Sequence, residues 1–368
     1  MKVSILQRCQ SALSHIFPNP SLEIQRLIHI LREKARHALP TAELPEKIYH
    51  YTDLNGLKGI VESETIYFSA MHMLSDASEV SYMWDLLQKN RECISMEKNT
   101  AYKNFVNGFY EYGASDELCK DFFTHKKMPE FLNIFSASFS VNGDSLHLWN
   151  GYSGEEHKGY NLAFSEKMLR LSFIEKLKTL AYNNSRFLAA LKQEGKSIEN
   201  YSPLFFHGST IYETEDQVKA LKKLFLDFWE FYRDRRNKGK YEAGQSIGML
   251  EDMDYDSFVY LHLFQAMTIL MVFVKDPHFL NEEEYRIAFF DYANVPGEPT
   301  VPKFLIVNSR NSGKDDIPYI AIPYDRKLIQ KVTISPPSGD ADRKKCIEDI
   351  LLSNYVHVTV DFSEIPLR

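Results

Sequence analysis

Short segments in which apolar and polar residues alternate are spread over both ends of the chain. At residues 134–140, Phe135, Ala137 and Phe139 occupy one face and serines occupy the other, which is the pattern of a half-buried β strand. Shorter apolar segments bounded by turn residues predict further strands. These lie at residues 48–52, 65–69, 161–165, 285–290, 303–308, 319–322, 330–335 and 355–361.

Other segments repeat their apolar residues with the spacing of one helix face. Residues 21–39 predict an N-terminal helix that prolines separate from the rest of the chain, and residues 218–232 predict a strongly amphipathic helix. Asp53 is placed to cap a helix that follows the first strand, and Asp340 is placed to cap a last helix at residues 341–353.

This order of elements predicts an α+β fold. Residues 46–368 are expected to form one α+β domain whose strands come from both ends of that segment. The mostly helical stretch at about residues 167–275 is then an insertion in the domain, and residues 1–45 form an N-terminal helical extension.

Charge and composition narrow the classes of protein. The chain has 43 basic and 50 acidic residues and a net charge of −7, which argues against general binding to nucleic acids or anionic membranes. The most apolar segment, residues 258–274, contains His262, Gln265 and Thr268, so we expect a buried helix rather than a membrane span. The four cysteines lie far apart, which favours reduced thiols in a cytoplasmic protein.

A late strand carries the clearest candidate for chemistry. Alternation from residue 284 onward places Glu284 and Arg286 on one face and Tyr285 on the other. Two interpretations stay open: a plain surface ion pair, or a carboxylate that a cation holds ready to stabilise a positively charged transition state. The preceding Glu282 and Glu283 are expected to be solvated neighbours.

The other candidate residues also have structural alternatives. His50 shares one side of its strand with Thr52, and it is either a hydrogen-bond donor for a hydroxyl-rich ligand or a structural histidine bonded to a backbone carbonyl. Tyr67 suits stacking on a planar ring. Trp149 and Tyr152 share one face of a predicted helical turn, where they either wall a pocket or pack in the core. The histidines show no metal-ligand spacing, so we expect no metal.

Several short polar motifs follow one another in a specific order along the chain. They are Tyr49-His50-Tyr51-Thr52, Ser69, Ser75-Asp76 with Glu79, Ser138-Phe139-Ser140, Trp149 with Tyr152, Glu282 to Arg286, and the terminal residues 363–368. This order resembles the bacterial family catalogued as domain of unknown function twenty-nine-seventy-one, over most of residues 47–368. The chain departs from that family at Ser75, where the family has Asn, and at Tyr285, where it has Trp.

A second resemblance, at the level of layout, is to ADP-ribosyltransferases of the DarT-like and poly-ADP-ribose-polymerase-like branches. It implies a mixed or antiparallel split sheet, with NAD as the substrate. It also implies that His50 binds the nicotinamide ribose, that Tyr67 stacks on nicotinamide, and that Glu284 stabilises the positively charged sugar as nicotinamide leaves. The other residues expected to bind NAD are Tyr51, Thr52, Ser69, Trp149, Tyr152 and Arg286.

The leading hypothesis is therefore an NAD-dependent ADP-ribosyltransferase or NAD-cleaving enzyme, of the kind found among bacterial toxins, defence proteins and effectors, with an unidentified macromolecular acceptor. The alternative is a non-catalytic sensor module that binds a nucleotide or a protein in an aromatic pocket. A third interpretation, a nucleic-acid hydrolase, is disfavoured by the charge and the absent metal-ligand spacing. If His50 and Glu284 face one cleft, catalysis is favoured, whereas positions on opposite sides of the sheet argue against it.

Overall fold

The computed structural model describes residues 44–71, 79–96, 98–111, 132–154, 158–193, 205–237, 255–292, 305–311, 316–337 and 339–366. The predicted helix at residues 21–39 lies outside these ranges, as do Ser75 and Asp76. The N-terminal helical extension therefore stays a prediction.

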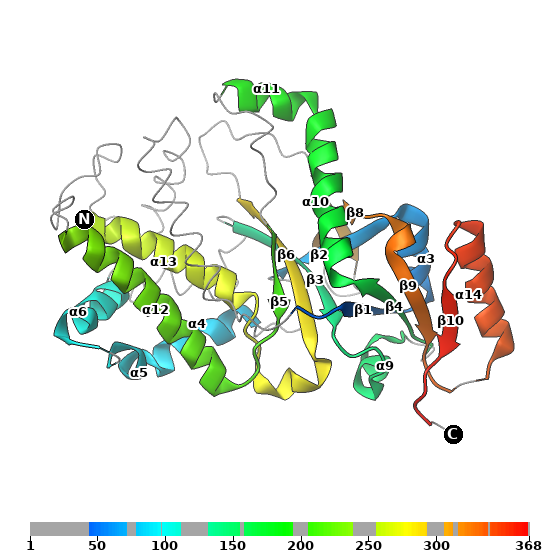
Figure 1. Ribbon diagram of the computed structural model, residues 1–368, viewed down its shortest axis with the longest axis horizontal. Helices are drawn as coiled ribbons and strands as arrows, with labels where there is room; N and C mark the ends of the chain where they lie inside the picture. The colour runs from blue at the N-terminus through cyan, green and yellow to red at the C-terminus, as the bar shows by residue number, and fades with distance from the viewer. Residues whose placement is uncertain are drawn as a thin grey trace.

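A large, open, mixed sheet dominates the described part of the chain, and most of its strands are antiparallel (Figure 1). Its order is β10-β9-β4-β1-β3-β2-β8-β7, while β6 pairs with β3 and β5 pairs with β6. The predicted α+β class is therefore confirmed. The strands are β1 (Lys47–Thr52), β2 (Thr65–Ala70), β3 (Leu132–Ser140), β4 (Tyr160–Ser165), β5 (Phe205–Ser209), β6 (Glu284–Tyr292), β7 (Val307–Asn311), β8 (Asp316–Pro323), β9 (Ile329–Ile334) and β10 (Thr359–Phe362).

The central strand β3 has three neighbours, and this splits the sheet. β6 pairs with it along its whole length, from Leu132 to Ser140. Because β6 takes one edge, β1 and β2 must share the other: β2 pairs at Phe135 and Ser136, and β1 pairs at Ser140. Between these points, at residues 137–139, β1 and β2 diverge. We call this opening the seam.

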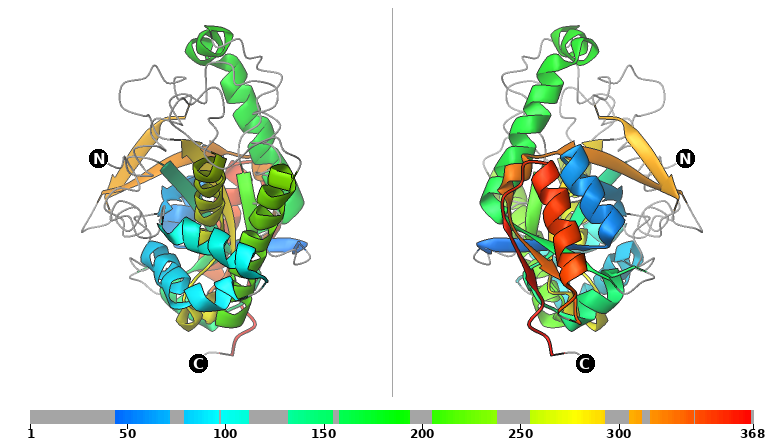
Figure 2. Two further views of the ribbon diagram at one scale, coloured as in Figure 1. Left: turned by 90° about the vertical axis from the view of Figure 1, so that its left-hand side faces the viewer. Right: turned by 90° about the vertical axis from the view of Figure 1, so that its right-hand side faces the viewer.

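One face of the sheet, which we call the apolar face, is covered by three helices (Figure 1). Alternate strand residues such as Ile48, Phe139 and Tyr285 pack with these helices in one buried cluster. The helices are α3 (Leu54–Ser63), α10 (Glu166–Asn183), which leads into α11 (Ser185–Gln193), and α14 (Ala341–Ser353). Figure 2 shows α3 and α14 side by side at the β10 end of the molecule.

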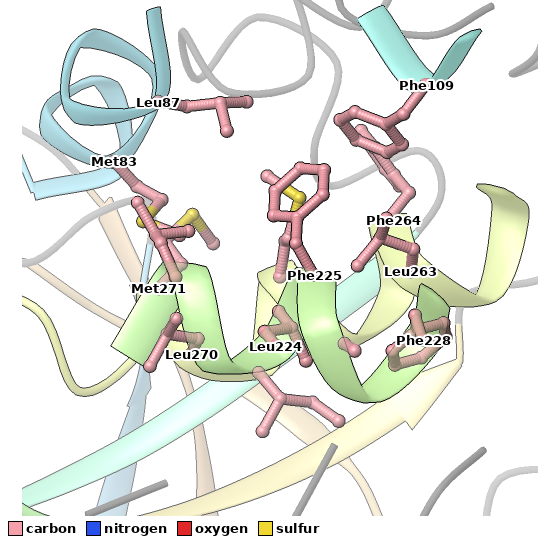
Figure 3. Close-up of a cluster of buried hydrophobic side chains, with 14 of the residues drawn as sticks. Met83, Leu87, Phe109, Leu224, Phe225, Phe228, Leu263, Phe264, Leu270 and Met271 are labelled. Atoms are coloured by element: carbon pink, nitrogen blue, oxygen red, sulfur yellow. The ribbon is translucent and has the colours of Figure 1, made fainter. Parts of the chain in front are cut away.

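Within the described ranges, five helices cover one end of the opposite face, which we call the polar face. Ile134, Phe206 and Ala288 from the sheet belong to one buried cluster with the apolar sides of the helices. Figure 3 shows helix residues of this cluster, such as Leu87, Phe225 and Leu263. These helices are α4 (Glu79–Lys89), α5 (Arg91–Ser95), α6 (Thr100–Phe109), α12 (Thr214–Asn237) and α13 (Tyr255–Met271). In the described part of the chain, no helix is both long enough and apolar enough to cross a membrane. α13 instead packs in this buried cluster.

At the other end of the polar face lie α9 (Leu146–Tyr152) and the short 3-10 helix η4 (Pro277–Glu282), which contact each other. A second short 3-10 helix, η5 (Arg326–Leu328), precedes β9. Both predicted caps are confirmed. Asp53 accepts a hydrogen bond from the Gly56 N–H at 2.7 Å, and Asp340 accepts one from the Arg343 N–H at 2.9 Å. These caps fix the starts of α3 and α14.

The predicted insertion at about residues 167–275 contains more than helices. β5 lies within it and pairs with β6 from Phe205 to Ser209, so the segment also adds a strand to the sheet. Its helices α12 and α13 supply much of the layer over the polar face. The division into one domain with an insertion stays a prediction.

Candidate functional site

Glu284 lies at the start of β6 in a buried cluster of charges on the polar face. Its Oε2 atom is 2.7 Å from Arg286 Nη2 and 3.4 Å from Lys275 Nζ. Glu284 is 5% exposed and Arg286 is 0% exposed, so this is not the surface ion pair that the sequence left open. We call Glu284, Arg286, Lys275 and Glu282 the carboxylate cluster.

The cluster keeps Glu284 ionised. Burial on its own raises the pKa of Glu284, but the charges of Arg286 and Lys275 and hydrogen bonds from Arg286 and Ser138 outweigh it and hold the pKa at about 2. At neutral pH the carboxylate therefore carries a negative charge and acts as an acceptor.

Ser138 connects Glu284 to His50. The Ser138 side chain hydrogen-bonds the Glu284 carboxylate, while its backbone carbonyl lies 3.1 Å from His50 Nδ1. The contact between His50 and Ser138 lies in the seam, since Ser138 is one of the residues of β3 that pair with neither β1 nor β2. His50 and Glu284 therefore approach one residue from two sides.

The two side chains do not share a face of the sheet. Tyr49 pairs with Ser140 and Ser140 pairs with Glu284, so these three residues face the same way. Alternation turns His50 the other way, and its ring lies 5.5 Å from the ring of Phe139 on the apolar face. The expectation that His50 and Glu284 face a single cleft is therefore not supported by the strand register.

His50 is half-buried, and its surroundings favour the neutral ring. Burial lowers the pKa of His50 and the charge of Arg310 lowers it further, against the opposing effect of the Ser138 carbonyl. A neutral ring bonded to a carbonyl through Nδ1 carries its proton there, which leaves Nε2 as a hydrogen-bond acceptor. The bond to a backbone carbonyl is also the structural role that the sequence left open.

Tyr152 joins the carboxylate cluster from α9. Burial, together with the carboxylates of Glu282 and Glu284, raises the pKa of Tyr152 to about 12, while Lys275 and Arg286 oppose this rise. The residue as a whole is 45% exposed, so part of its surface stays open to solvent. At neutral pH its hydroxyl is a proton donor beside an ionised carboxylate.

Tyr51 and Trp149 pack against each other next to this site. Their rings meet edge to face with centroids 4.7 Å apart, in a small buried cluster. The Tyr51 hydroxyl donates to the Asn142 carbonyl at 2.9 Å, and Trp149 Nε1 donates to Asp144 at 2.7 Å. Both polar groups are thus used within the protein, and the pair supports α9 rather than exposing a ligand wall.

Thr52 and the residues of β2 lie in different places. A side chain at Gly56 would meet the Thr52 hydroxyl, so Thr52 packs against the start of α3. Ser69 pairs with Ser136 on the polar face, and alternation places Tyr67 on that face as well. The predicted binding residues therefore separate into a β2 group, a seam group and the carboxylate cluster.

Sequence reasoning missed part of the carboxylate cluster. Lys275 Nζ contacts Glu282 Oε2 at 2.7 Å, so Glu282 is ion-paired and not the solvated neighbour that we expected. Tyr212 accepts a hydrogen bond from the Glu284 N–H at 3.0 Å. The available signal was the position of Lys275, a single cation directly after the apolar segment 258–274.

A second buried carboxylate lies on the apolar face. Glu166 Oε1 accepts hydrogen bonds from Arg170 Nε and from the Tyr285 hydroxyl, both at 2.9 Å. His207 Nδ1 lies 2.9 Å from the same hydroxyl. Because Tyr285 lies between Glu284 and Arg286 on β6, this network fixes the strand that carries the carboxylate cluster.

Comparisons with known proteins add one match. No curated protein and no solved structure matches the chain. Residues 148–287, less than half of the chain, match the family described as "Protein of unknown function (DUF2971)". The match includes Trp149, Tyr152, Glu284 and Arg286, and over this segment it confirms the first family resemblance that the sequence motifs indicated.

Proposed function

We propose that the chain is an NAD-dependent ADP-ribosyltransferase or NAD-cleaving enzyme, in which Glu284 stabilises the sugar cation. The observation that carries the proposal is the ionised carboxylate of Glu284, held at Ser138 beside the seam that His50 enters. An ionised, oriented carboxylate can stabilise positive charge that develops on a sugar in the transition state.

The chemistry requires no redox step. The bond between the ribose carbon and the nicotinamide nitrogen breaks, and its electron pair leaves with nicotinamide. The ribose then carries an oxocarbenium-like positive charge. Water or an acceptor hydroxyl attacks this carbon and loses a proton, which gives ADP-ribose or an ADP-ribosylated acceptor.

The contacts of Glu284 suit this role. Arg286 and Lys275 both contact Oε2 of Glu284, which holds the carboxylate in place. We assign the hydrogen bond to a ribose hydroxyl to the other carboxylate oxygen, Oε1, because both oxygens of an ionised carboxylate can accept. Tyr152 is the neighbouring donor for a second ligand oxygen.

The role of His50 changes from the one that the resemblance implied. Because Nδ1 is directed at the Ser138 carbonyl, Nε2 of the neutral ring accepts a hydrogen bond and cannot donate one. We therefore assign the contact with the sugar to Glu284 on the polar face. His50, on the other side of the sheet, contacts the Ser138 carbonyl and takes no part in binding the sugar.

Nicotinamide release from NAD tests the proposal. We expect the wild type to release nicotinamide, and Glu284→Gln to lower kcat at least 100-fold because the uncharged amide cannot stabilise a cation as a carboxylate does. Glu283→Gln is the matched control, since Glu283 is the exposed neighbour, and it should keep the wild-type rate. Circular dichroism must show that both variants are folded.

Three outcomes would decide against the proposal or a part of it. If the wild type releases no nicotinamide with any candidate acceptor, the enzyme proposal fails. If NAD then binds without turnover and Glu284→Gln keeps the affinity, the non-catalytic sensor module is the better account. If Glu284→Gln turns over like the wild type, Glu284 has no part in the mechanism. The assignment to a cytoplasmic bacterial toxin, defence protein or effector depends on finding activity first.

A further inference from the structure

A second candidate binding surface lies on the polar face, two strands away from the carboxylate cluster. Tyr319 of β8 pairs with Ser69 of β2, and alternation puts Tyr67 on the same side. Arg310 of β7 reaches over this pair of strands, and its Nη2 atom donates to Ser69 Oγ at 3.0 Å. We call Tyr67, Ser69, Tyr319 and Arg310 the tyrosine–arginine surface.

The two tyrosines form an exposed stack. Their ring centroids lie 4.2 Å apart with an interplanar angle of 27°, and Tyr67 is 42% exposed. Stacking fixes the orientation of both rings and leaves aromatic surface open to solvent. Such a surface suits a planar ring, as bases stack on aromatic side chains in nucleotide-binding proteins.

Arg310 is the cation of this surface. It is exposed, and within the described part of the chain its hydrogen bond to Ser69 has no accompanying ion pair with a carboxylate. Arg286 and Arg170 differ, because each contacts a buried glutamate. A guanidinium has several N–H donors in one plane, and these match the oxygens of a phosphate. Arg310 therefore has donors left for an anion.

Two observations connect this surface to the seam. The charge of Arg310 acts on His50 and lowers its pKa, so the guanidinium lies within electrostatic range of the seam. Ser136, between Ser69 and the carboxylate-cluster strand β6, has a buried hydroxyl that no described group hydrogen-bonds. Since β2 and β6 flank β3, about 10 Å separates their backbones, a span that one nucleoside can cover.

We propose that the tyrosine–arginine surface binds the phosphate-bearing part of a nucleotide, with Arg310 on a diphosphate oxygen and the Tyr67–Tyr319 stack beside a planar ring. This inference rests on the proposed function, because it gives the diphosphate of the dinucleotide a place next to the seam. Arg310 then determines specificity for phosphorylated ligands, whereas Glu284 acts on the sugar.

Calorimetric titration with ADP and with adenosine tests this inference independently of turnover. Arg310→Gln should weaken ADP binding between about 10-fold and 100-fold, the size expected for a lost charged hydrogen bond, and should change adenosine binding less than about 2-fold. Arg310→Lys should recover part of the ADP affinity, since it restores the charge without the planar donors. Lys327→Gln, which removes an exposed cation elsewhere, should bind ADP like the wild type.

The outcomes separate this inference from the proposed function. If the wild type does not bind ADP, or if Arg310→Gln binds ADP as tightly as the wild type, the surface is not a phosphate site. An equal loss of ADP and adenosine affinity would also overturn it, because the effect would then not depend on phosphate. Arg310-dependent ADP binding without nicotinamide release would support the surface and refute only the enzyme. Nicotinamide release with an unchanged KM in Arg310→Gln would refute only the surface.

Discussion

At the scale of single residues, the proposed site depends on Ser138 and Glu284. Alternation predicted that Glu284 and Arg286 share a face, and their contact at 2.7 Å agrees with it. No local pattern could predict that Ser138 lies between His50 and Glu284, because this depends on how three distant strands meet. Lys275 was missed although it directly follows the apolar segment 258–274, because only the fold brings it to within 3.4 Å of Glu284.

The lowered pKa of Glu284 predicts how stability depends on pH. Its pKa is about 2 in the folded chain, against an ordinary value of 4.5, so the folded state binds fewer protons than the unfolded state between these values. The stabilisation by Glu284 is present above about pH 4.5 and is lost as the pH falls toward 2. Urea unfolding at a series of pH values should show a steeper fall for the wild type than for Glu284→Gln. Parallel curves would contradict this assignment.

The carboxylate cluster also predicts how much stability is lost when Glu284 is replaced. At neutral pH, Glu284→Gln should lower the free energy of unfolding by about 3–5 kcal/mol, because two buried cations lose their partner. Glu283→Gln should change it by less than about 0.5 kcal/mol, as expected for an exposed residue. If urea titrations find that both variants change the free energy of unfolding by the same small amount, burial of Arg286 and Lys275 does not require the charge of Glu284.

At the scale of elements, hydrogen bonds to Asp144 connect α9 with residues 363–365, which we call the C-terminal tail. Asp144 Oδ1 accepts hydrogen bonds from Trp149 Nε1 at 2.7 Å and from Ser363 Oγ at 2.6 Å, and Oδ2 accepts one from the Glu364 N–H at 2.8 Å. Ile365 packs on the same cluster as Trp149. Residues 363–365 of the terminal motif therefore have a structural role: they position the helix that carries Tyr152.

Replacing Asp144 tests this role. Asp144→Asn should lower the free energy of unfolding by about 1–3 kcal/mol, because an amide nitrogen would face the Glu364 N–H or the Trp149 indole N–H and leave that donor without a partner. Asp361→Asn is the control, since its partly exposed pair with Lys331 should contribute less than about 1 kcal/mol. If urea unfolding finds both variants equally stable, the tail does not hold α9.

At the scale of the whole molecule, strand and helix patterns predicted the α+β class and most element positions. The last helix, α14, has the predicted bounds, whereas β7 begins at Val307 and not at residue 303. β5 was missed because its five residues do not alternate clearly and because it is defined by pairing with β6. The seam could not be predicted from periodicity, since it depends on which strands share one edge of β3.

The most direct test of the central claim is the rate of nicotinamide release by Ser138→Ala relative to the wild type, with both proteins shown to be folded by their thermal unfolding. The variant keeps the backbone carbonyl that contacts His50 and loses only the hydrogen bond to Glu284. We predict that kcat falls by about tenfold or more, because Glu284 is no longer oriented, while the melting temperature changes by only a few degrees. An unchanged kcat would contradict the site described here.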